Sequence, residues 1–179
     1  MPPVRLLIVD DSANIHEDIR KILAAPQRSA IEDLEDELFG SGVSSVKTSS
    51  PTEQLNDDPT EVRFEIESAY QGDDGIGLLS ASLAQNRPFA VAFVDMRMPP
   101  GLDGLATVEK LWQIDPRLQV VICSAYSDYS WAEMTRRIGR SDRFLILRKP
   151  FENVEVLQLA HCLSAKWRLA EANVRVERA

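Results

Sequence analysis

Short apolar runs alternate with amphipathic stretches along this chain. Four mostly apolar runs of four or five residues lie at 5–9, 90–94, 119–123 and 144–147. Runs this short are typical of strands that are buried on both faces of a parallel sheet. A fifth run, residues 62–69, alternates between apolar and charged positions, which predicts a half-exposed strand at a sheet edge.

The stretches after these five runs have the spacing of helices. The first of them carries its apolar residues three and four positions apart, at Ile15, Ile19, Ile22 and Leu23. The last begins near Glu152 and continues to the C-terminus without a helix breaker. Five strands, each followed by a helix, predict an α/β fold with a doubly wound parallel sheet, covered on both faces through right-handed crossovers.

Residues able to do chemistry follow directly after four of the five strands. They are Asp10 and Asp11 after the first, Asp95 after the third, Ser124 after the fourth and Lys149 after the fifth. Taken singly, each acid has an ordinary alternative role, since Asp is a favoured helix cap. The carboxyl ends of parallel strands share one sheet edge, where open α/β folds bind their ligands, so we expect these side chains to converge.

Three carboxylates in one place repel each other unless a cation lies among them. Mg²⁺ prefers oxygen ligands and keeps several waters, so the acids predict a magnesium site in which Asp10 and Asp11 hold the ion. A carboxylate is also a nucleophile toward phosphorus, and Asp95 would both ligate the metal and attack, forming an aspartyl phosphate. Ser124 and Lys149 would hold the phosphoryl oxygens.

Composition narrows the partners. The chain is 44% apolar, which supports a packed core, and its net charge of −8 argues against direct binding to nucleic acid or an anionic membrane. Cys123 and Cys162 do not form a disulfide framework, and no signal peptide or long apolar stretch is present, so we expect a cytoplasmic protein. We interpret His16 and His161, on the first and last helices, as structural or surface residues.

Most of the charge lies in one segment, residues 26–60. Eight acidic residues there stand against Arg28 and Lys47, a local net charge of −6. Positions 31–39 have helical spacing, and the Ser- and Thr-rich remainder is typical of a long loop. Two interpretations stay open: a solvated surface insertion, or a flap that docks a partner through Leu34, Leu38 and Phe39.

Four motifs resemble the receiver domain of two-component response regulators. They are Ile8-Val9-Asp10-Asp11, Val94-Asp95-Met96-Arg97-Met98-Pro99, Ser124-Ala125 and Lys149-Pro150-Phe151. The resemblance covers roughly residues 5–163, interrupted by 26–60, and implies a flavodoxin-like sheet of strand order 2-1-3-4-5 in a bacterial signalling protein.

The same resemblance implies a mechanism. Asp95 would accept a phosphoryl group from the phosphohistidine of a sensor histidine kinase or phosphotransfer protein. The Mg²⁺ would be held by Asp10, Asp11, Asp95 and the backbone carbonyl of Arg97. A cis peptide bond is implied before Pro150. The chain would catalyse only its own phosphorylation and dephosphorylation.

Three features depart from the usual family pattern. Ile146 stands where the family has an aromatic switch residue, so we expect output to depend more on how two receivers meet. The loop after Asp95, which reads Pro99-Pro100-Gly101-Leu102-Asp103-Gly104, is one residue longer than the common form. Segment 26–60 is an unusual insertion, and chains that resemble this one in having it tend to precede kinase or cyclic-di-nucleotide output domains.

The C-terminal helix extends beyond the length a receiver needs. Apolar residues in it follow a heptad seam, at Val156, Ala160, Leu163, Trp167, Ala170 and Val174. We therefore divide the chain into a receiver domain, 4–163, and a helical connector, 164–179, expected to be free of the domain and to pair as a coiled coil. This predicts a homodimer through the helix, which leads to an output domain.

Other functions fit less well. A haloacid-dehalogenase-like phosphatase also forms an aspartyl phosphate with Mg²⁺, but it carries Asp-x-Asp after its first strand, whereas this chain reads Asp10-Asp11-Ser12. A pseudo-receiver, which docks without being phosphorylated, typically lacks one of the acids or the lysine, and none is lost here. A flavin-binding protein of this fold is disfavoured because the acidic sheet edge would repel its phosphate.

Overall fold

A computed structural model describes residues 2–24, 62–125, 130–139 and 142–177 of the chain, with side chains as far as 173. The two interpretations of segment 26–60 therefore fall outside the described residues. Within them, none of the helices combines the length and the apolar character needed to cross a bilayer.

The five predicted strands form one parallel sheet. They are β1 (Val4–Val9), β2 (Phe64–Ala69), β3 (Val91–Asp95), β4 (Gln119–Ser124) and β5 (Phe144–Arg148). Their order is β2-β1-β3-β4-β5, and every neighbouring pair is parallel. The predicted fold class and strand order are confirmed.

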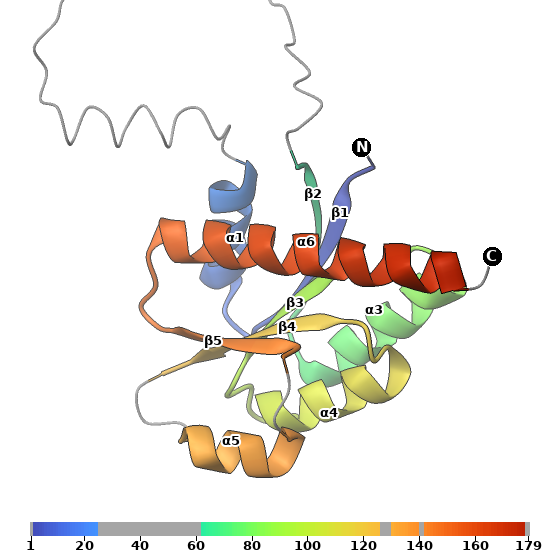
Figure 1. Cartoon of the computed structure of the whole chain (residues 1–179). Coiled ribbons are helices and arrows are strands. Elements are labelled where there is room, and N and C mark those ends of the chain that lie inside the picture. Colours follow the sequence, from blue (N-terminus) through green and yellow to red (C-terminus); the bar gives the residue numbers. More distant parts are fainter. Residues whose placement is uncertain (1, 25–61, 126–129, 140–141, 178–179) are drawn as a thin grey trace, which may run out of the picture.

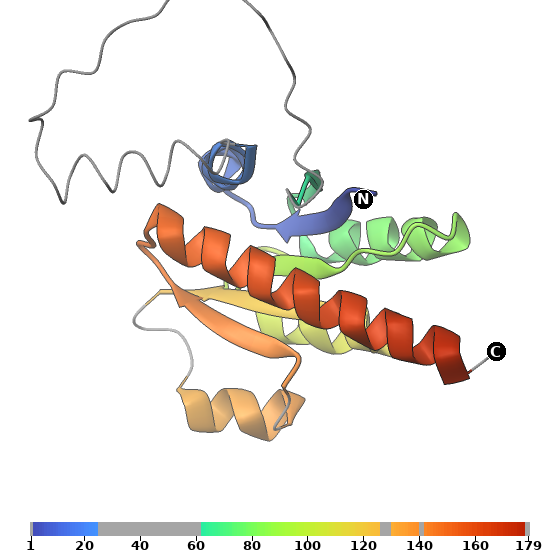
Figure 2. The same ribbon diagram turned by 45° about the horizontal axis from the view of Figure 1, so that its top comes forward.

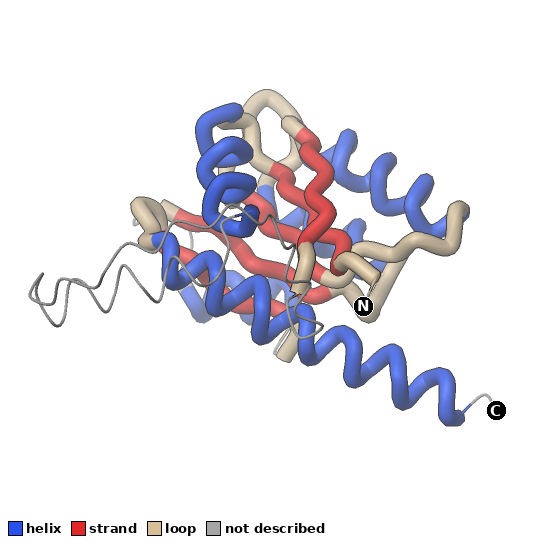
Figure 3. Tube along the Cα trace, turned by 90° about the horizontal axis from the view of Figure 1, so that it is seen from above, coloured by secondary structure: helices blue, strands red, loops and turns tan. Residues whose placement is uncertain are grey.

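Helices cover both faces of this sheet (Figures 1 and 3). One face packs against α1 (Ala13–Ala24) and α6 (Asn153–Glu177), and the other against α3 (Gly72–Ala84), α4 (Gly104–Ile114) and α5 (Trp131–Ile138). Successive residues of β1 serve the two sides, since Leu7 and Val9 join the α3–α5 core while Leu6 and Ile8 join the α1–α6 core. This explains why the strand is apolar at consecutive positions.

The alternating run behaves as an edge strand. β2 begins at Phe64, two residues later than predicted, and all its residues but Ala69 are only partly buried. Its alternation places Glu65 and Glu67 beside Arg5 of β1, which pairs with both. The charged residues Glu65 and Glu67 of β2 are therefore partly exposed to water and also pair with the neighbouring strand β1.

The last helix differs from the sequence prediction. Helix α6 crosses one face of the sheet from end to end (Figures 1 and 2). Beyond Leu163 it still contacts the domain: Ser164 is buried, Trp167 packs against the α1–α6 core, and Glu171 pairs with Arg117 at 2.6 Å. The expectation that the helix leaves the domain after Leu163 is wrong for residues 164–171.

The heptad seam is divided by this packing. Its first three residues, Val156, Ala160 and Leu163, are buried against the sheet, whereas Ala170 is exposed. The side chain of Val174 lies outside the described residues. Apolar residues at this spacing can pack either against a domain or against a partner helix. Here the first half of the seam packs against the domain.

Candidate functional site

The carboxyl edge of the sheet gathers the predicted site residues. Asp10 directly follows β1, Asp95 and Ser124 end β3 and β4, and Lys149 directly follows β5. The pairing Val9↔Val94 sets Asp10 level with Asp95, and Asp95↔Cys123 puts Ser124 one position beyond. The register of neighbouring strands thus brings four distant parts of the chain together.

Three carboxylates meet at this edge. Asp10, Asp11 and Asp95 each offer an oxygen atom, and these oxygens lie within 4.8 Å of one another. Asp10 and Asp95 are buried, at 2% and 8% exposed, whereas Asp11 is exposed. The arrangement combines two fixed acids with one that faces water, so a ligand can enter from the solvent side.

Lys149 is the cation that bridges the two buried acids. Its Nζ donates to Asp10 Oδ2 at 2.8 Å and to Asp95 Oδ1 at 2.9 Å. Burial opposes the charged form of the lysine, but these hydrogen bonds outweigh it and raise the pKa of Lys149. The lysine therefore stays charged at neutral pH, and one positive charge faces three negative ones.

The electrostatics of Asp95 favour the arrival of more positive charge. Burial raises the pKa of its carboxyl group, and repulsion from Asp10 and Asp11 adds to this, although the hydrogen bond from Lys149 acts in the opposite direction. A buried carboxyl group whose pKa is raised by burial, and further by like charges, is stabilised in its ionised form by a nearby cation. The excess negative charge of the site therefore favours the binding of a cation.

The loop after Asp95 closes tightly on the strand end. Met96 donates to the carbonyl of Cys123 at 2.9 Å, and Gly104 donates to the carbonyl of Met96 at 2.9 Å. A Cβ on Gly104 would lie 2.5 Å from the carbonyl oxygen of Asp95, so only glycine allows this approach. The peptide bond from Lys149 to Pro150 is cis, as the resemblance implies, and the bond from Pro99 to Pro100 is cis as well.

Ser124 lies buried beside the acids. Its hydroxyl donates to the carbonyl of Ala125 at 3.0 Å, and its own carbonyl accepts from the amide of Lys149 at 2.9 Å. Its neighbour Cys123 is fully buried, which raises the pKa of the thiol to about 12 and leaves it uncharged. Ile146 packs partly buried against the α3–α5 core.

Sequence reasoning missed one contact at this edge. His16, interpreted as structural or surface, is 2% exposed, and its Nε2 lies 2.7 Å from the backbone oxygen of Asp10. The histidine therefore touches the backbone of a predicted metal ligand. The sequence signal is weak, since it consists only of a polar residue on the apolar side of α1, six positions after Asp10.

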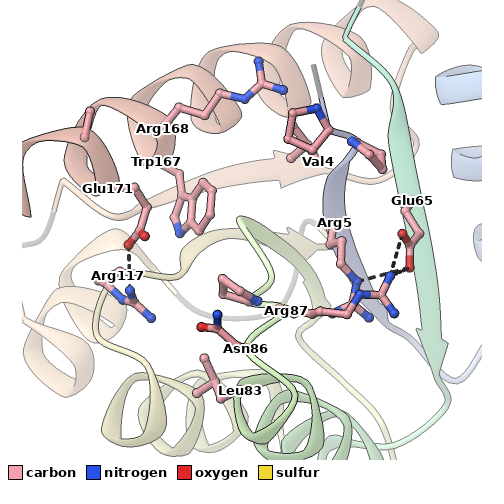
Figure 4. Close-up of a pocket in the computed structure, with 14 residues that line it drawn as sticks. Val4, Arg5, Glu65, Leu83, Asn86, Arg87, Arg117, Trp167, Arg168 and Glu171 are labelled. Carbon is pink, nitrogen blue, oxygen red and sulfur yellow. Dashed lines mark hydrogen bonds and ion pairs between the residues drawn. The ribbon is translucent and has the colours of Figure 1, made fainter. Parts of the chain in front are cut away.

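The amino edge of the sheet has a cavity of about 620 Å³, lined in part by Arg5, Arg87, Arg117 and Arg168 (Figure 4). Arg5 and Arg87 both pair with Glu65, and Arg117 pairs with Asp115 and Glu171. Carboxylates thus balance Arg5, Arg87 and Arg117 within the protein. The cavity lies at the opposite end of β1 from the acids, so it plays no part in their chemistry.

Comparison with known proteins agrees with this geometry. The sequence profile described as "Response regulator receiver domain" matches residues 53–161. The DNA-binding transcriptional regulator NtrC of Escherichia coli K12 is 35% identical over 111 residues. The matched part is 58% of this chain but only 22% of that regulator.

Solved structures share the fold. One is the crystal structure of an adenylate cyclase from Rhodopirellula baltica, with a TM-score of 0.65 and 19% identity, covering 99% of this chain and 98% of that one. Another is a response regulator receiver domain protein from Methanospirillum hungatei, with a TM-score of 0.60 and 18% identity, covering 94% and 99%. The profile covers more than half of the chain, and the sheet order agrees with it. The chain belongs to the family of response regulator receiver domains.

Proposed function

We propose that this domain is a phosphoacceptor that receives a phosphoryl group on Asp95 from a histidine kinase or phosphotransfer protein. The observation that carries the proposal is the position of Lys149, which bridges Asp10 and Asp95 while Asp11 faces solvent. A buried carboxylate with a lysine at hydrogen-bond distance is arranged to attack phosphorus and to stabilise the charge that follows.

The donor set fits Mg²⁺. Asp10, Asp11 and Asp95 supply carboxylate oxygens that lie close enough to share one ion. The backbone carbonyl of Arg97 is proposed as a fourth oxygen ligand. Hard divalent cations take such ligands and keep waters in the remaining positions. When bound, the ion neutralises the acids and the phosphoryl oxygens, which lets a phosphate approach an acidic edge.

The protein groups then divide the transfer among them. A carboxylate oxygen of Asp95 forms the new bond to phosphorus while the bond from phosphorus to the partner's imidazole nitrogen breaks, and the imidazole leaves with that electron pair. Lys149 Nζ, now 2.9 Å from Asp95, moves to a phosphoryl oxygen, and the Ser124 hydroxyl donates to another. Ser124 exchanges its present bond to Ala125 for this one.

Labelling with acetyl phosphate and Mg²⁺ tests the acceptor. The intact protein should gain one phosphoryl group by mass spectrometry, and Asp95→Asn should gain none. Asp18→Asn, an exposed acid on α1, is the matched control and should label normally. Labelling of Asp95→Asn at the wild-type level would assign the acceptor elsewhere. Wild-type protein that takes up no label would favour a pseudo-receiver that only docks.

We further propose that α6 carries the signal to an output domain. The helix starts close after Lys149 and reaches the amino edge at Glu171. NtrC is a regulator in which the matched part is about a fifth of the length. By analogy this chain would act in the cytoplasm as the input module of a bacterial protein, without binding nucleic acid itself.

The exposed second half of the α6 seam is proposed to pair two copies of the chain. Ala170 of that seam is exposed, and Leu169, its neighbour outside the seam, is 69% exposed and adds apolar surface beside it. Burial of such apolar surface favours association. Analytical ultracentrifugation should show a weak dimer that a phosphoryl mimic strengthens, and Leu169→Glu should shift it toward monomer. A monomer at high concentration, with and without the mimic, would contradict dimerisation through α6.

A further inference from the structure

We propose that His16 is a positioning residue for the metal site, because it fixes the orientation of the peptide unit that joins Asp10 to Asp11. This inference rests on the proposed function and adds a residue to it. The backbone oxygen of Asp10 accepts a hydrogen bond from the imidazole. That oxygen belongs to the same rigid peptide plane as the amide of Asp11.

Both ring nitrogens of His16 have partners. Nε2 lies 2.7 Å from the oxygen of Asp10, and Nδ1 lies 2.8 Å from Oγ of Ser68, which comes from β2. The ring also lies against Tyr70, with 4.5 Å between the ring centroids. A buried histidine needs a partner at each ring nitrogen, and here one of those partners is the backbone of Asp10, a proposed metal ligand.

The neighbours of Ser68 decide which nitrogen carries the proton. Arg20 Nη2 donates to Ser68 Oγ at 2.8 Å, so the serine oxygen is already an acceptor. The hydroxyl can then direct its own proton to Nδ1 of His16, which leaves the ring proton on Nε2. The backbone oxygen of Asp10 can only accept, and it requires this tautomer. A directed chain therefore runs from Arg20 through Ser68 and His16 to Asp10.

Every other polar group of Asp10 is also held. Its amide donates to the carbonyl of Ala69 at 3.1 Å, Oδ1 accepts from the amide of Ser12 at 2.8 Å, and Oδ2 accepts from Lys149. The bond from His16 is the contact that sets the tilt of the peptide plane after Asp10. If it is lost, the plane can rotate, and the carboxylates of Asp10 and Asp11 no longer keep one relative orientation.

The consequence is selective for the metal. Mg²⁺ demands near-ideal geometry and gives up its waters reluctantly, so a loosened pair of acids binds it less well. The acceptor Asp95 is held by β3 and Lys149 and does not depend on His16. We therefore expect a change at His16 to weaken metal binding while leaving the phosphorylation rate at saturating Mg²⁺ close to normal.

Two substitutions separate positioning from space filling. His16→Leu keeps apolar volume and removes the donor, whereas His16→Gln places an amide N–H where Nε2 now lies. Calorimetry with Mg²⁺ alone should show affinity at least tenfold lower for His16→Leu and within about threefold of wild type for His16→Gln. With acetyl phosphate, His16→Leu should need more Mg²⁺ for half-maximal labelling but reach a near-normal maximal rate. His161→Leu, a change distant from the acids, is the control and should match wild type.

The outcomes distinguish this inference from the proposed function. Wild-type protein that neither binds Mg²⁺ nor labels overturns the proposed function and this inference with it. If wild type labels and His16→Leu binds Mg²⁺ with equal affinity, the positioning role of His16 is wrong and the phosphoacceptor stands. Equal loss of affinity in the Leu and Gln variants also contradicts it, because the donor would then not matter.

If His16→Leu does not fold, nitrogen NMR of the His16 imidazole in the wild-type protein tests the inference instead. The inference requires a proton on Nε2, slow exchange of that proton, and a shift of its resonance on addition of Mg²⁺. A proton on Nδ1 instead, or a resonance that ignores Mg²⁺, would overturn the assignment.

Discussion

The two edges of the sheet handle charge in opposite ways. At the carboxyl edge Lys149 faces Asp10, Asp95 and the exposed Asp11, so negative charge is in excess. At the amino edge the charged side chains form ion pairs with one another. Arg5 pairs with Glu65 and Glu67, and is also held by Ser82 and by the carbonyl of Arg87.

This difference in charge balance distinguishes a ligand-binding site, at the carboxyl edge, from a structural charge network, at the amino edge. A charge network that is complete within the protein holds strands together and needs no ligand, even where it lines a cavity. A network left one-sided in a buried place costs stability, and it is retained where a ligand supplies the missing charge. The balance of charge, rather than the size of a cavity, identifies the chemistry in this domain.

The largest expected effect is on stability, at the amino edge. Arg5→Met removes the cation shared by Glu65 and Glu67, leaves Glu65 with Arg87 alone, and should lower the free energy of unfolding by about 2–3 kcal/mol, measured by urea denaturation. Labelling of the folded protein should stay normal. Lys21→Met removes an exposed cation that pairs with Glu17, and it should cost less than about 0.5 kcal/mol. A large loss of labelling in folded Arg5→Met would contradict the view that the amino edge serves stability and not the chemistry at the acids.

The next effect is on function, at the carboxyl edge. Asp11→Ala removes charge that the metal needs, so Mg²⁺ affinity should fall at least tenfold, about 1.4 kcal/mol, by calorimetry. Without Mg²⁺ the same variant should be as stable as wild type or more so, because a repelling charge is gone. If Asp11→Ala is destabilised in the absence of metal, the carboxylates are not in excess, and the comparison between the edges loses its basis.

The smallest effect concerns His161, which packs edge-on against Phe64, the first residue of β2. Burial, together with Arg168, lowers the pKa of His161. The unfolded chain then binds a proton more readily than the folded one, so stability is full above about pH 6.5 and falls as the pH drops through the lowered folded value. Urea midpoints at pH 7.5 and 5.5 should differ less in His161→Phe than in wild type. An equal difference would mean that other groups cause the pH dependence.

The convergence of Asp10, Asp95 and Lys149 could be predicted because it follows from where strands stop. Apolar runs that end at Asp10, Asp95 and Lys149 place these residues at one edge, and the parallel sheet does the rest. Distances and charge balance could not be predicted, since the pairing of Lys149 with both Asp10 and Asp95 depends on side-chain packing.

Two contacts, those of His16 and Glu171, could not be predicted from the sequence for a related reason. His16 finds Ser68 on a strand 52 positions away, and a lone histidine on a helix carries no sign of its partner. Glu171 meets Arg117, 54 positions away, where the heptad seam suggested a helix already free of the domain. Periodicity records that a helix face is apolar, but it does not record which surface covers that face.

The open sides of the sheet have a consequence for solubility. Within the described residues, β2 and β5 are the outermost strands, and each has one neighbour. An unpaired apolar strand can recruit a strand from another copy and start aggregation. Leu145 of β5 is 43% exposed, but Arg143 and Arg148 flank the apolar run to which it belongs. These arginines are placed as gatekeepers, which oppose edge-to-edge stacking of copies of this chain.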